Sequence, residues 1–327
     1  MISASAPGKV ILWGEYAVLA GAPAMVMAVD RRAVCRIEPT TPRASDARVW
    51  RFTSQGFSAP EIDLEVSRLS ADTPPEHAGS LMFWHVIREL LRNSDRSALP
   101  AGARIVTDSQ EFYQDGKKLG IGSSAAVCVA VYAASCELLG VRCDFKQALN
   151  IHNRFQDKLG SGIDVAAAYH GGSLRFQAQH ATPFDLAPHL QLRFIWTGHA
   201  AKTIHHIQRF NAWIELGAIA PLTTLANTSE ALFEHADLAT LGRYCNELKE
   251  LDAAAELGIY SDPHAQLDHL AIDAEVVYKP CGAGGGDIGV AISDDAARLD
   301  AFVAAAVDLG FDSIALEKAS NGVQVAR

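Results

Sequence analysis

The sequence predicts an α+β fold with two domains, and three observations support this. The chain has 327 residues, and at about 150 residues per domain this length suggests roughly two domains. Hydrophobic residues make up 49% of the chain and charged residues 20%, a balance typical of globular proteins and too apolar for disorder. Strand-like and helix-like segments follow one another without strict alternation, which favours α+β over a doubly wound parallel sheet.

The first half of the chain combines several strands with one very apolar helix. Runs of apolar residues predict strands over residues 10–13, over 24–38 as two strands, and over 103–107. Apolar residues at helical spacing predict a helix that Ser80 caps. Residues 125–139 are almost all apolar, so we expect this helix to be buried on most sides.

After Gly140, helices and strands are expected to follow one another without a regular order. Asp144 is expected to cap a helix that runs towards residue 160. The later predicted elements are strands at 174–176 and 190–196, mostly helix over 202–258, a helix beginning at Ser261, a strand at 289–292, a helix over 294–309, and strands at 313–317 and 323–326. The best candidate for a domain boundary lies near residues 180–188. We therefore predict domains at 1–183 and 184–327.

Composition disfavours several classes of protein. Lys and Arg number 28 against 38 Asp and Glu, so the net charge is −10, which argues against a nucleic-acid binder with a broad basic face. No uncharged apolar run approaches the roughly 18 residues that a membrane-spanning helix needs. The first residues do not resemble a signal peptide, and the six cysteines are scattered without a C-x-x-C pair. We therefore expect free thiols, a cytoplasmic location, and no nucleic-acid or membrane partner.

A glycine-bearing segment before the apolar helix has the character of a phosphate site. Its residues are Gly120, Ile121, Gly122, Ser123, Ser124, Ala125 and Ala126. Glycines permit a close approach of the backbone to a ligand, and the start of a helix offers free N–H groups and a positive dipole end. The two serine hydroxyls suit phosphate oxygens or Mg²⁺. The spacing differs from the P-loop and Rossmann patterns, and glycines that serve packing alone are an equally good interpretation.

Three further features stand out along the chain. A second glycine-rich loop contains Gly282, Ala283, Gly284, Gly285 and Gly286. Its cost in chain entropy predicts close packing on another loop or a phosphate, with a hinge as the alternative. Lys9 and Glu15, near the N-terminus, read on their own as a surface pair. Asp164 follows Gly-Ser-Gly and suits a helix cap, a base or a metal ligand.

Together these segments resemble the three motifs of the GHMP kinase superfamily, which comprises galactokinases, homoserine kinases, mevalonate kinases and phosphomevalonate kinases. The first motif is Pro7-Gly8-Lys9 with Gly14-Glu15, the second is residues 120–126, and the third is residues 282–286. They occur in the family's order and span almost the whole chain. The resemblance implies the family's two-domain fold, with an N-terminal domain like domain 2 of ribosomal protein S5 and a ferredoxin-like C-terminal domain.

Within the superfamily the chain is most similar to the bacterial-type phosphomevalonate kinases. One pointer is Tyr16, because mevalonate kinases usually carry His after the glutamate, and another is the stretch around Lys117 and Lys118. Residues 162–164 also resemble the catalytic stretch of mevalonate kinases. The implied function is transfer of the γ-phosphoryl group of ATP to 5-phosphomevalonate, on the mevalonate route to isoprenoids, with mevalonate as the alternative acceptor.

The resemblance also implies roles for individual residues. ATP and Mg²⁺ would bind over the second motif, with Ser123 or Ser124 reaching the metal. Asp164 would orient or deprotonate the acceptor, and Lys9 would offset the charge of the phosphoryl group in transit. A phosphomonoester is already ionised near neutral pH, so it gains more from cations than from a base. The candidate acceptor-binding residues are Glu15, Tyr16, Lys117, Lys118, Arg154 and Lys202.

Several alternatives stay open on the sequence. Glu15 is equally suited to a structural salt bridge, and Lys117, Lys118 and Arg154 to a solvated surface. The acceptor is alternatively a sugar, a heptose or homoserine. A catalytically inactive member that binds a nucleotide or metabolite and regulates another process is the non-enzyme alternative, although the retained Asp164 argues against it. A monomer or a homodimer is expected.

Overall fold

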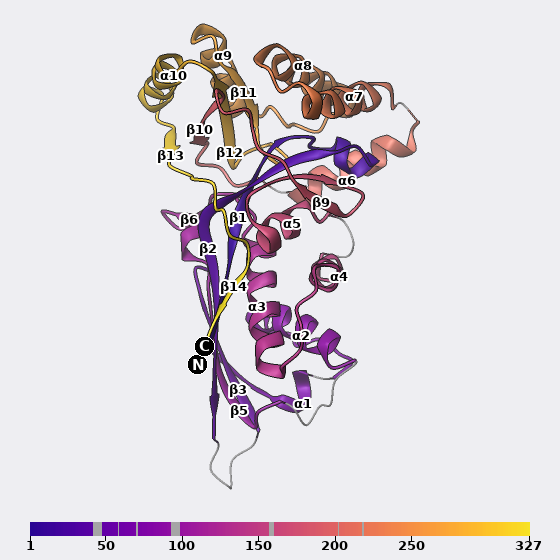
Figure 1. Ribbon diagram of the computed structural model, residues 1–327, viewed down its shortest axis with the longest axis vertical. Coiled ribbons are helices and arrows are strands. Elements are labelled where there is room, and N and C mark those ends of the chain that lie inside the picture. The colour runs from indigo at the N-terminus through magenta and orange to yellow at the C-terminus, as the bar shows by residue number, and fades with distance from the viewer. Residues whose placement is uncertain are drawn as a thin grey trace.

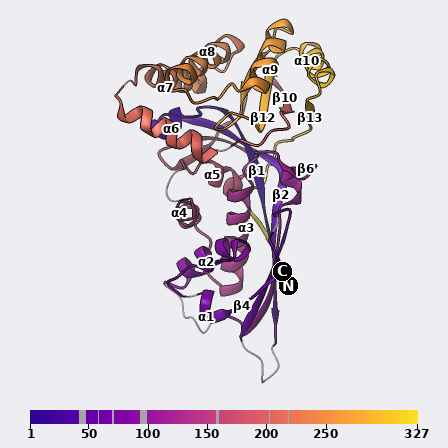
Figure 2. The same ribbon diagram turned by 180° about the vertical axis from the view of Figure 1, so that it is seen from behind.

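The computed structural model describes residues 1–41, 48–57, 59–69, 71–92, 99–156, 160–201, 203–217 and 219–327. Two sheets organise these residues, an eight-stranded sheet in the lower part of Figure 1 and a four-stranded sheet in the upper part. Four helices, α2 to α5, lie along one face of the larger sheet, and Figure 2 shows the same layer from behind. The sheets and helices mix without regular alternation, as predicted.

The larger sheet is built around two long strands, β1 (Ile2–Trp13) and β2 (Ala24–Thr40). Its order is β14-β1-β2-β5-β3-β4, with β8 on the first part of β2 and β9 on β8. The predicted division of 24–38 into two strands is wrong. The register on β1 shifts between Pro7 and Gly8, so Asp30 and Arg31 are extra residues in a bulge and the strand continues through them.

The remaining strands of this sheet are short. They are β3 (Val49–Gln55), β4 (Ile62–Glu65), β5 (Gly102–Asp108), β8 (Ser173–Gln177), β9 (His180–Pro183) and β14 (Gln324–Ala326). β3 and β5 pair in parallel, and the other pairs are antiparallel. A separate hairpin joins β6 (Tyr113–Gln114) to β7 (Lys117–Lys118), just before the second motif.

The apolar helix predicted over 125–139 is α3 (Ser123–Leu139), and it is the central helix of this half. It packs on β1 and β2 and is surrounded by α2 (Ala78–Leu90), α4 (Phe145–Phe155) and α5 (Ile163–His170), which explains why it is apolar all round. Asp144 caps α4 by accepting the N–H of Gln147, as predicted. Ser80 does not cap α2, because His77 precedes the helix and the Ser80 hydroxyl donates to its carbonyl.

The smaller sheet confirms the ferredoxin-like domain. Its order is β11-β12-β10-β13 and every pair is antiparallel. The strands are β10 (Gln191–Trp196), β11 (Val277–Pro280), β12 (Ile288–Ser293) and β13 (Asp312–Ile314). Helix α10 (Ala296–Asp308) connects β12 to β13. This is the βαββαβ order, with extra helices in the connection from β10 to β11.

That connection contains four helices: α6 (Thr203–Glu215), α7 (Ala220–Glu234), α8 (Leu238–Ala255) and α9 (Asp262–Asp273). A short helix, α1 (Val66–Leu69), lies in the other half. β9 belongs to the larger sheet and β10 to the smaller one, whereas β14 returns the C-terminal end to β1. The predicted division at residue 183 stays a prediction.

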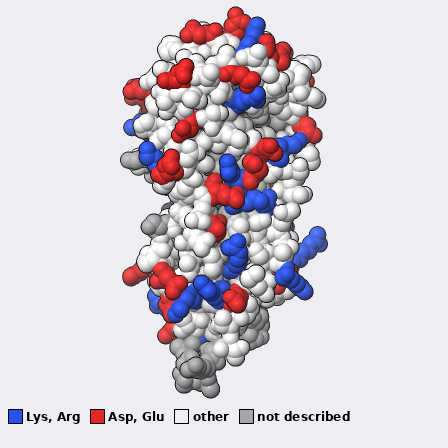
Figure 3. Space-filling view, turned by 90° about the vertical axis from the view of Figure 1, so that its left-hand side faces the viewer, with Lys and Arg blue, Asp and Glu red and all other residues white. Residues whose placement is uncertain are grey.

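One hydrophobic cluster extends through both halves. It includes Trp13 and Met25 from the larger sheet, Phe194 and Trp196 from the smaller one, and Tyr244 from α8. On the face seen in Figure 3, which lies opposite α2 to α5, acidic and basic side chains are intermixed. Within the described ranges no helix is both long and apolar enough to cross a membrane.

Candidate active site between the two sheets

Lys9 lies where β1 meets the loop that leads into α3. Its backbone N–H donates to the carbonyl of Ile121 at 2.8 Å. Gly122 has φ 82° and precedes the first residue of α3, and a Cβ atom built on it would lie 3.0 Å from Cγ of Lys9. A Cβ on Gly8 would lie 2.7 Å from the Ile121 carbonyl oxygen. The first two motifs are therefore in direct contact, and their glycines permit it.

The second motif opens onto a cavity of about 190 Å³. Ser123 and Ser124, the first residues of α3, line it together with Lys118. Much of the remaining wall is apolar and comes from Phe57, Met82, Phe83, Tyr113, Val127 and Phe155. No side chain caps the start of α3, so its first N–H groups face a ligand site with the positive end of the helix dipole.

His152, which the sequence did not single out, holds the hydroxyl of Ser124. Its Nε2 lies 3.2 Å from Ser124 Oγ, and the side chain is fully buried. Its Nδ1 is buried without a partner among the described residues. A buried N–H without a partner is rarer than a buried acceptor, so we assign the proton to Nε2. With this assignment Ser124 accepts a hydrogen bond from His152 and keeps its own hydroxyl proton as a donor.

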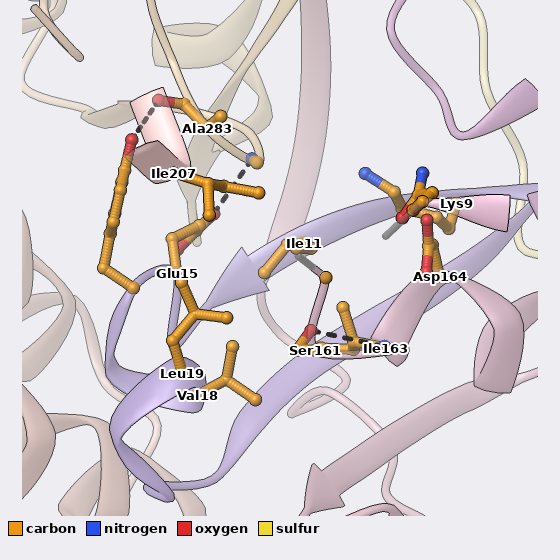
Figure 4. A pocket seen from close by; sticks show the side chains of 14 residues that line it. Lys9, Ile11, Glu15, Val18, Leu19, Ser161, Ile163, Asp164, Ile207 and Ala283 are labelled. Carbon is orange, nitrogen blue, oxygen red and sulfur yellow. Dashed lines mark hydrogen bonds between the residues drawn. The ribbon is translucent and has the colours of Figure 1, made fainter. Parts of the chain in front are cut away.

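A second cavity, of about 130 Å³, lies between β1, α5 and the third-motif loop (Figure 4). Lys9 and Asp164 both line it, and Figure 4 shows their side chains on the same side of the pocket. The apolar part of its lining consists of Ile11, Val18, Leu19, Ile163 and Ile207. Of the lining residues that the structure describes, Lys9 is the one cation.

Asp164 is not the cap of its helix. Gly162, with φ 85°, takes the N-cap position of α5, and Asp164 lies in the first turn. Its carboxylate accepts the N–H of Val165 at 3.0 Å and is partly exposed to the cavity. The positive end of α5 favours a negative charge here. The interpretation of Asp164 as a cap, which the sequence left open, is therefore wrong.

The third-motif loop is closely packed, so the alternative of a free hinge is also wrong. A Cβ on Gly284 would lie 2.5 Å from Cγ2 of Ile259, and one on Gly286 would lie 2.6 Å from the carbonyl oxygen of His199. Asp287 follows the loop, and its carboxylate accepts the N–H of Ala201. The loop therefore packs on neighbouring segments of the smaller domain, as its entropy cost predicts.

Glu15 is in a buried ion pair with Lys279, the residue three places before the third motif. Glu15 is 3% exposed and Lys279 0%. The Lys279 ammonium also donates to the carbonyl of Ile11 at 3.3 Å, and Tyr244 donates its hydroxyl proton to Glu15 at 3.0 Å. Burial by itself would lower the pKa of Lys279, but the adjacent Glu15 carboxylate outweighs burial and raises it. The salt bridge that the sequence left open for Glu15 is thus present.

The other candidate acceptor-binding residues have different surroundings. Tyr16 lines the Lys9–Asp164 cavity and donates to the carbonyl of Ala283 at 2.6 Å. The ammonium of Lys117 donates to the carbonyl of Gly198. Arg154 pairs with Glu89 and lines a third cavity, of about 100 Å³, which shares no lining residue with the other two. Lys202 lies outside the described residues.

Three residues of this region were missed from the sequence: His152, Tyr244 and the role of Lys279. A signal existed for Lys279, because a lysine in an otherwise apolar strand requires a buried partner. None existed for His152 or Tyr244, since each lies on an amphipathic helix far along the chain from the group that it contacts. A single sequence does not show such long-range pairs.

The cysteines offer a chemical test of the third-motif loop. Burial raises the pKa of the Cys281 thiol to about 11, whereas a hydrogen bond from Cys136 lowers the pKa of Cys143. Both residues are partly exposed. The thiolate is the reactive form, so iodoacetamide at pH 7.5 is expected to modify Cys143 before Cys281. Peptide mass spectrometry over time measures the order, and modification of Cys281 first would contradict it.

His264 on α9 supports the third-motif loop from behind and predicts a pH effect on stability. Its Nε2 donates to the Gly286 carbonyl and its Nδ1 accepts from Tyr278. Burial lowers its pKa to about 4, against about 6.5 in an unfolded chain. As pH falls from about 6.5 towards 4, the unfolded chain binds a proton that the native state does not, so stability falls by up to roughly 3 kcal/mol.

Replacing His264 with glutamine is expected to flatten this decline. The measurement is the thermal unfolding midpoint of both proteins between pH 7 and pH 4.5. An equal slope for the wild type and the variant would show that His264 is not the group responsible.

Comparison with known proteins shows what the chain is similar to. Residues 82–172 match the model of the GHMP kinases N terminal domain. The chain is 28% identical to a phosphomevalonate kinase of Streptomyces sp. (strain CL190) over 90% of both chains. It is 24% identical to a mevalonate kinase of Pyrococcus abyssi (strain GE5 / Orsay), over 88% of this chain and 87% of that one.

A solved structure shows the same fold. It is the Streptococcus pneumoniae phosphomevalonate kinase in complex with phosphomevalonate and AMPPNP, with a TM-score of 0.77 at 20% identity over 97% of this chain and 100% of that one. The matched domain contains the second motif and Asp164, and the relatives span nearly the whole chain. The chain is therefore similar over nearly its whole length to phosphomevalonate kinases and mevalonate kinases, and residues 82–172 match the N-terminal domain of the GHMP kinases, a family of ATP-dependent phosphotransferases.

Proposed function

We propose that the protein transfers the γ-phosphoryl group of ATP to 5-phosphomevalonate. One observation carries the proposal. Gly122 brings the anion-binding start of α3 against Lys9, and Lys9 shares a cavity with Asp164. A phosphate held by the N–H groups of α3 would thus lie beside the cation and the carboxylate that act on it.

The nucleotide is assigned to the cavity at the start of α3. Its aromatic and aliphatic wall suits a base, while the free N–H groups of the helix and the Ser124 proton suit the phosphates. Lys118 adds a positive charge at the wall. The Streptococcus pneumoniae enzyme was solved with the nucleotide analogue AMPPNP, which supports this use of the fold.

Magnesium fits the same place by its chemistry. The described residues contain no cluster of three or more His, Cys, Asp or Glu that would hold a metal ion alone. Mg²⁺ in kinases is held chiefly by substrate phosphates with one or two protein oxygens, and Ser123 and Ser124 offer hydroxyl oxygens at the start of α3. When bound, Mg²⁺ supplies neutralisation of phosphate charge.

The two charged residues of the second cavity have complementary tasks. Asp164 orients the acceptor oxygen and takes its proton if that oxygen carries one. Lys9 offsets the negative charge of the phosphoryl group as it moves between the two oxygens. The apolar wall of Ile11, Ile163 and Ile207 holds the carbon skeleton of the acceptor and excludes water.

Two observations bear on the identity of the acceptor, and they favour different molecules. Phosphomevalonate kinases of Streptomyces sp. and Saccharolobus solfataricus, at 28% and 27% identity, match nine-tenths of the chain. Mevalonate is the second candidate, because Lys9 is the one cation among the described lining residues of the acceptor cavity. A phosphomonoester needs several cations, whereas an alcohol needs a base such as Asp164.

The test is coupled release of ADP from ATP and Mg²⁺ with (R)-mevalonate, 5-phosphomevalonate, homoserine and galactose in parallel. Turnover confined to 5-phosphomevalonate is the expected result. Turnover of mevalonate instead would keep the site and change the acceptor. Turnover of none, together with tight binding of AMPPNP, would favour a non-catalytic nucleotide-binding protein.

A further inference from the structure

The turn that follows β1 is hydrogen-bonded to the third-motif loop through two consecutive side chains. Glu15 accepts the backbone N–H of Gly282 at 3.4 Å, and Tyr16 donates to the carbonyl of Ala283 at 2.6 Å. Both bonds are drawn in Figure 4. Two adjacent residues of the loop, one through its N–H and one through its carbonyl, are thus held by two adjacent residues of the turn after β1.

Two side chains of the smaller domain hold this turn in place. Lys279, which leads into the third motif, pairs with Glu15 and donates to the Ile11 carbonyl on β1. Tyr244 on α8 bridges the same turn, since its hydroxyl accepts the N–H of Gly14 at 2.7 Å and donates to Glu15 at 3.0 Å. All of these groups are buried, so each bond is shielded from competing water.

The third-motif loop lies next to the ammonium group of Lys9 in the candidate active site. A Cβ atom built on Gly282 would lie 3.7 Å from Nζ of Lys9, so this glycine borders the ammonium group directly. Gly282 and Ala283 also line the cavity that contains Lys9 and Asp164. A small shift of the loop would therefore change both the space around Lys9 and the shape of the cavity.

We propose that Glu15, Tyr16, Lys279 and Tyr244 form a clamp that positions the third-motif loop over Lys9. These four are positioning residues: they act through the loop and not by contact with the acceptor. The carboxylate of Glu15 accepts hydrogen bonds from three protein donors, on Lys279, Tyr244 and Gly282. These contacts explain how the charged group can be buried, and no contact with a substrate is needed to explain it. The position of the loop does not depend on the proposed kinase activity, whereas the expected effect on turnover does.

The deletion of one hydroxyl tests the clamp, and the chain supplies a matched control. Tyr132 on α3 resembles Tyr244 closely: it is fully buried, its hydroxyl accepts one backbone N–H, from Asp144 at 2.9 Å, and it donates to Gln147 at 2.8 Å. The two bonds of its hydroxyl go to Gln147 and Asp144, and neither involves the third-motif loop or the turn after β1. Tyr244→Phe and Tyr132→Phe therefore remove equal numbers of hydrogen bonds from different places.

The first measurement is amide hydrogen exchange in peptides that cover residues 281–287, without any ligand. Tyr244→Phe removes two hydrogen bonds and is expected to speed exchange there by at least about tenfold, whereas Tyr132→Phe is expected to leave it unchanged. Equal exchange of this segment in the two variants would overturn the clamp. Because no turnover is required, this result is independent of whether the proposed acceptor is right.

The second measurement is steady-state kinetics with the acceptor that the enzyme turns over. Tyr244→Phe and Tyr16→Phe are expected to lower kcat by about tenfold with little change in the acceptor KM, whereas Tyr132→Phe keeps both constants. A raised acceptor KM at unchanged kcat would instead make these residues acceptor ligands and overturn their positioning role.

Discussion

Asp164→Asn is expected to lower kcat by about 10²-fold through lost orientation of an ionised acceptor, and by up to about 10⁴-fold where the acceptor oxygen carries a proton that Asp164 takes. Asparagine keeps the shape of the side chain and its bond to the Val165 N–H, so α5 is expected to stay intact. Asp164 lines the cavity proposed for the acceptor and is absent from the lining of the cavity proposed for the nucleotide, so affinity for AMPPNP is expected to change little. Coupled ADP release and a binding titration measure the two quantities separately.

Asp295→Asn is the control for this variant. Asp295 caps α10, in the smaller domain, by accepting the N–H of Ala297, and asparagine caps helices as well as aspartate does. We expect full activity from it. Full activity of Asp164→Asn would defeat the assignment of Asp164, whereas equal losses of turnover and of nucleotide affinity would indicate a disrupted fold near the site.

Lys279→Met is expected to destabilise the protein by about 3–5 kcal/mol, because it leaves the Glu15 carboxylate buried without its ion-pair partner. The double variant Glu15→Gln with Lys279→Met removes both charges together. Its stability is expected to return close to that of the wild type, since a buried ion pair contributes little net free energy once its desolvation is counted. Urea unfolding, with the m value checked for constancy, measures all three proteins.

Lys249→Met provides the comparison for a more accessible pair. Lys249 bonds to Asp268 at 2.7 Å, but its side chain is 34% exposed. Its loss is expected to cost at most about 1 kcal/mol. If Lys279→Met is as mild as Lys249→Met, or if the double variant is no more stable than the single one, the buried pair does not have the energetics inferred from its burial.

Local patterns were sufficient for a large part of the fold. The all-apolar stretch before Gly140 predicted the central helix α3, because a helix without a polar face must be covered on every side. Asp144 predicted the start of α4, because capping depends on neighbours within one turn. The prediction of two strands over 24–38 failed, because Asp30 and Arg31 form a bulge within one strand. In the sequence this polar pair resembles a turn. Only pairing with β1 distinguishes the two.

The candidate site divides in the same way between near and distant interactions. The glycines at 120 and 122 and the three ordered motifs were recognisable in the chain, since the phosphate-binding start of a helix is built from consecutive residues. The partners of these residues were not recognisable. The structure decides that Glu15 meets Lys279 and that His152 meets Ser124, because these contacts join residues 264 and 28 positions apart. Such contacts arise only when two sheets and their helices pack, and packing is a property of the whole chain.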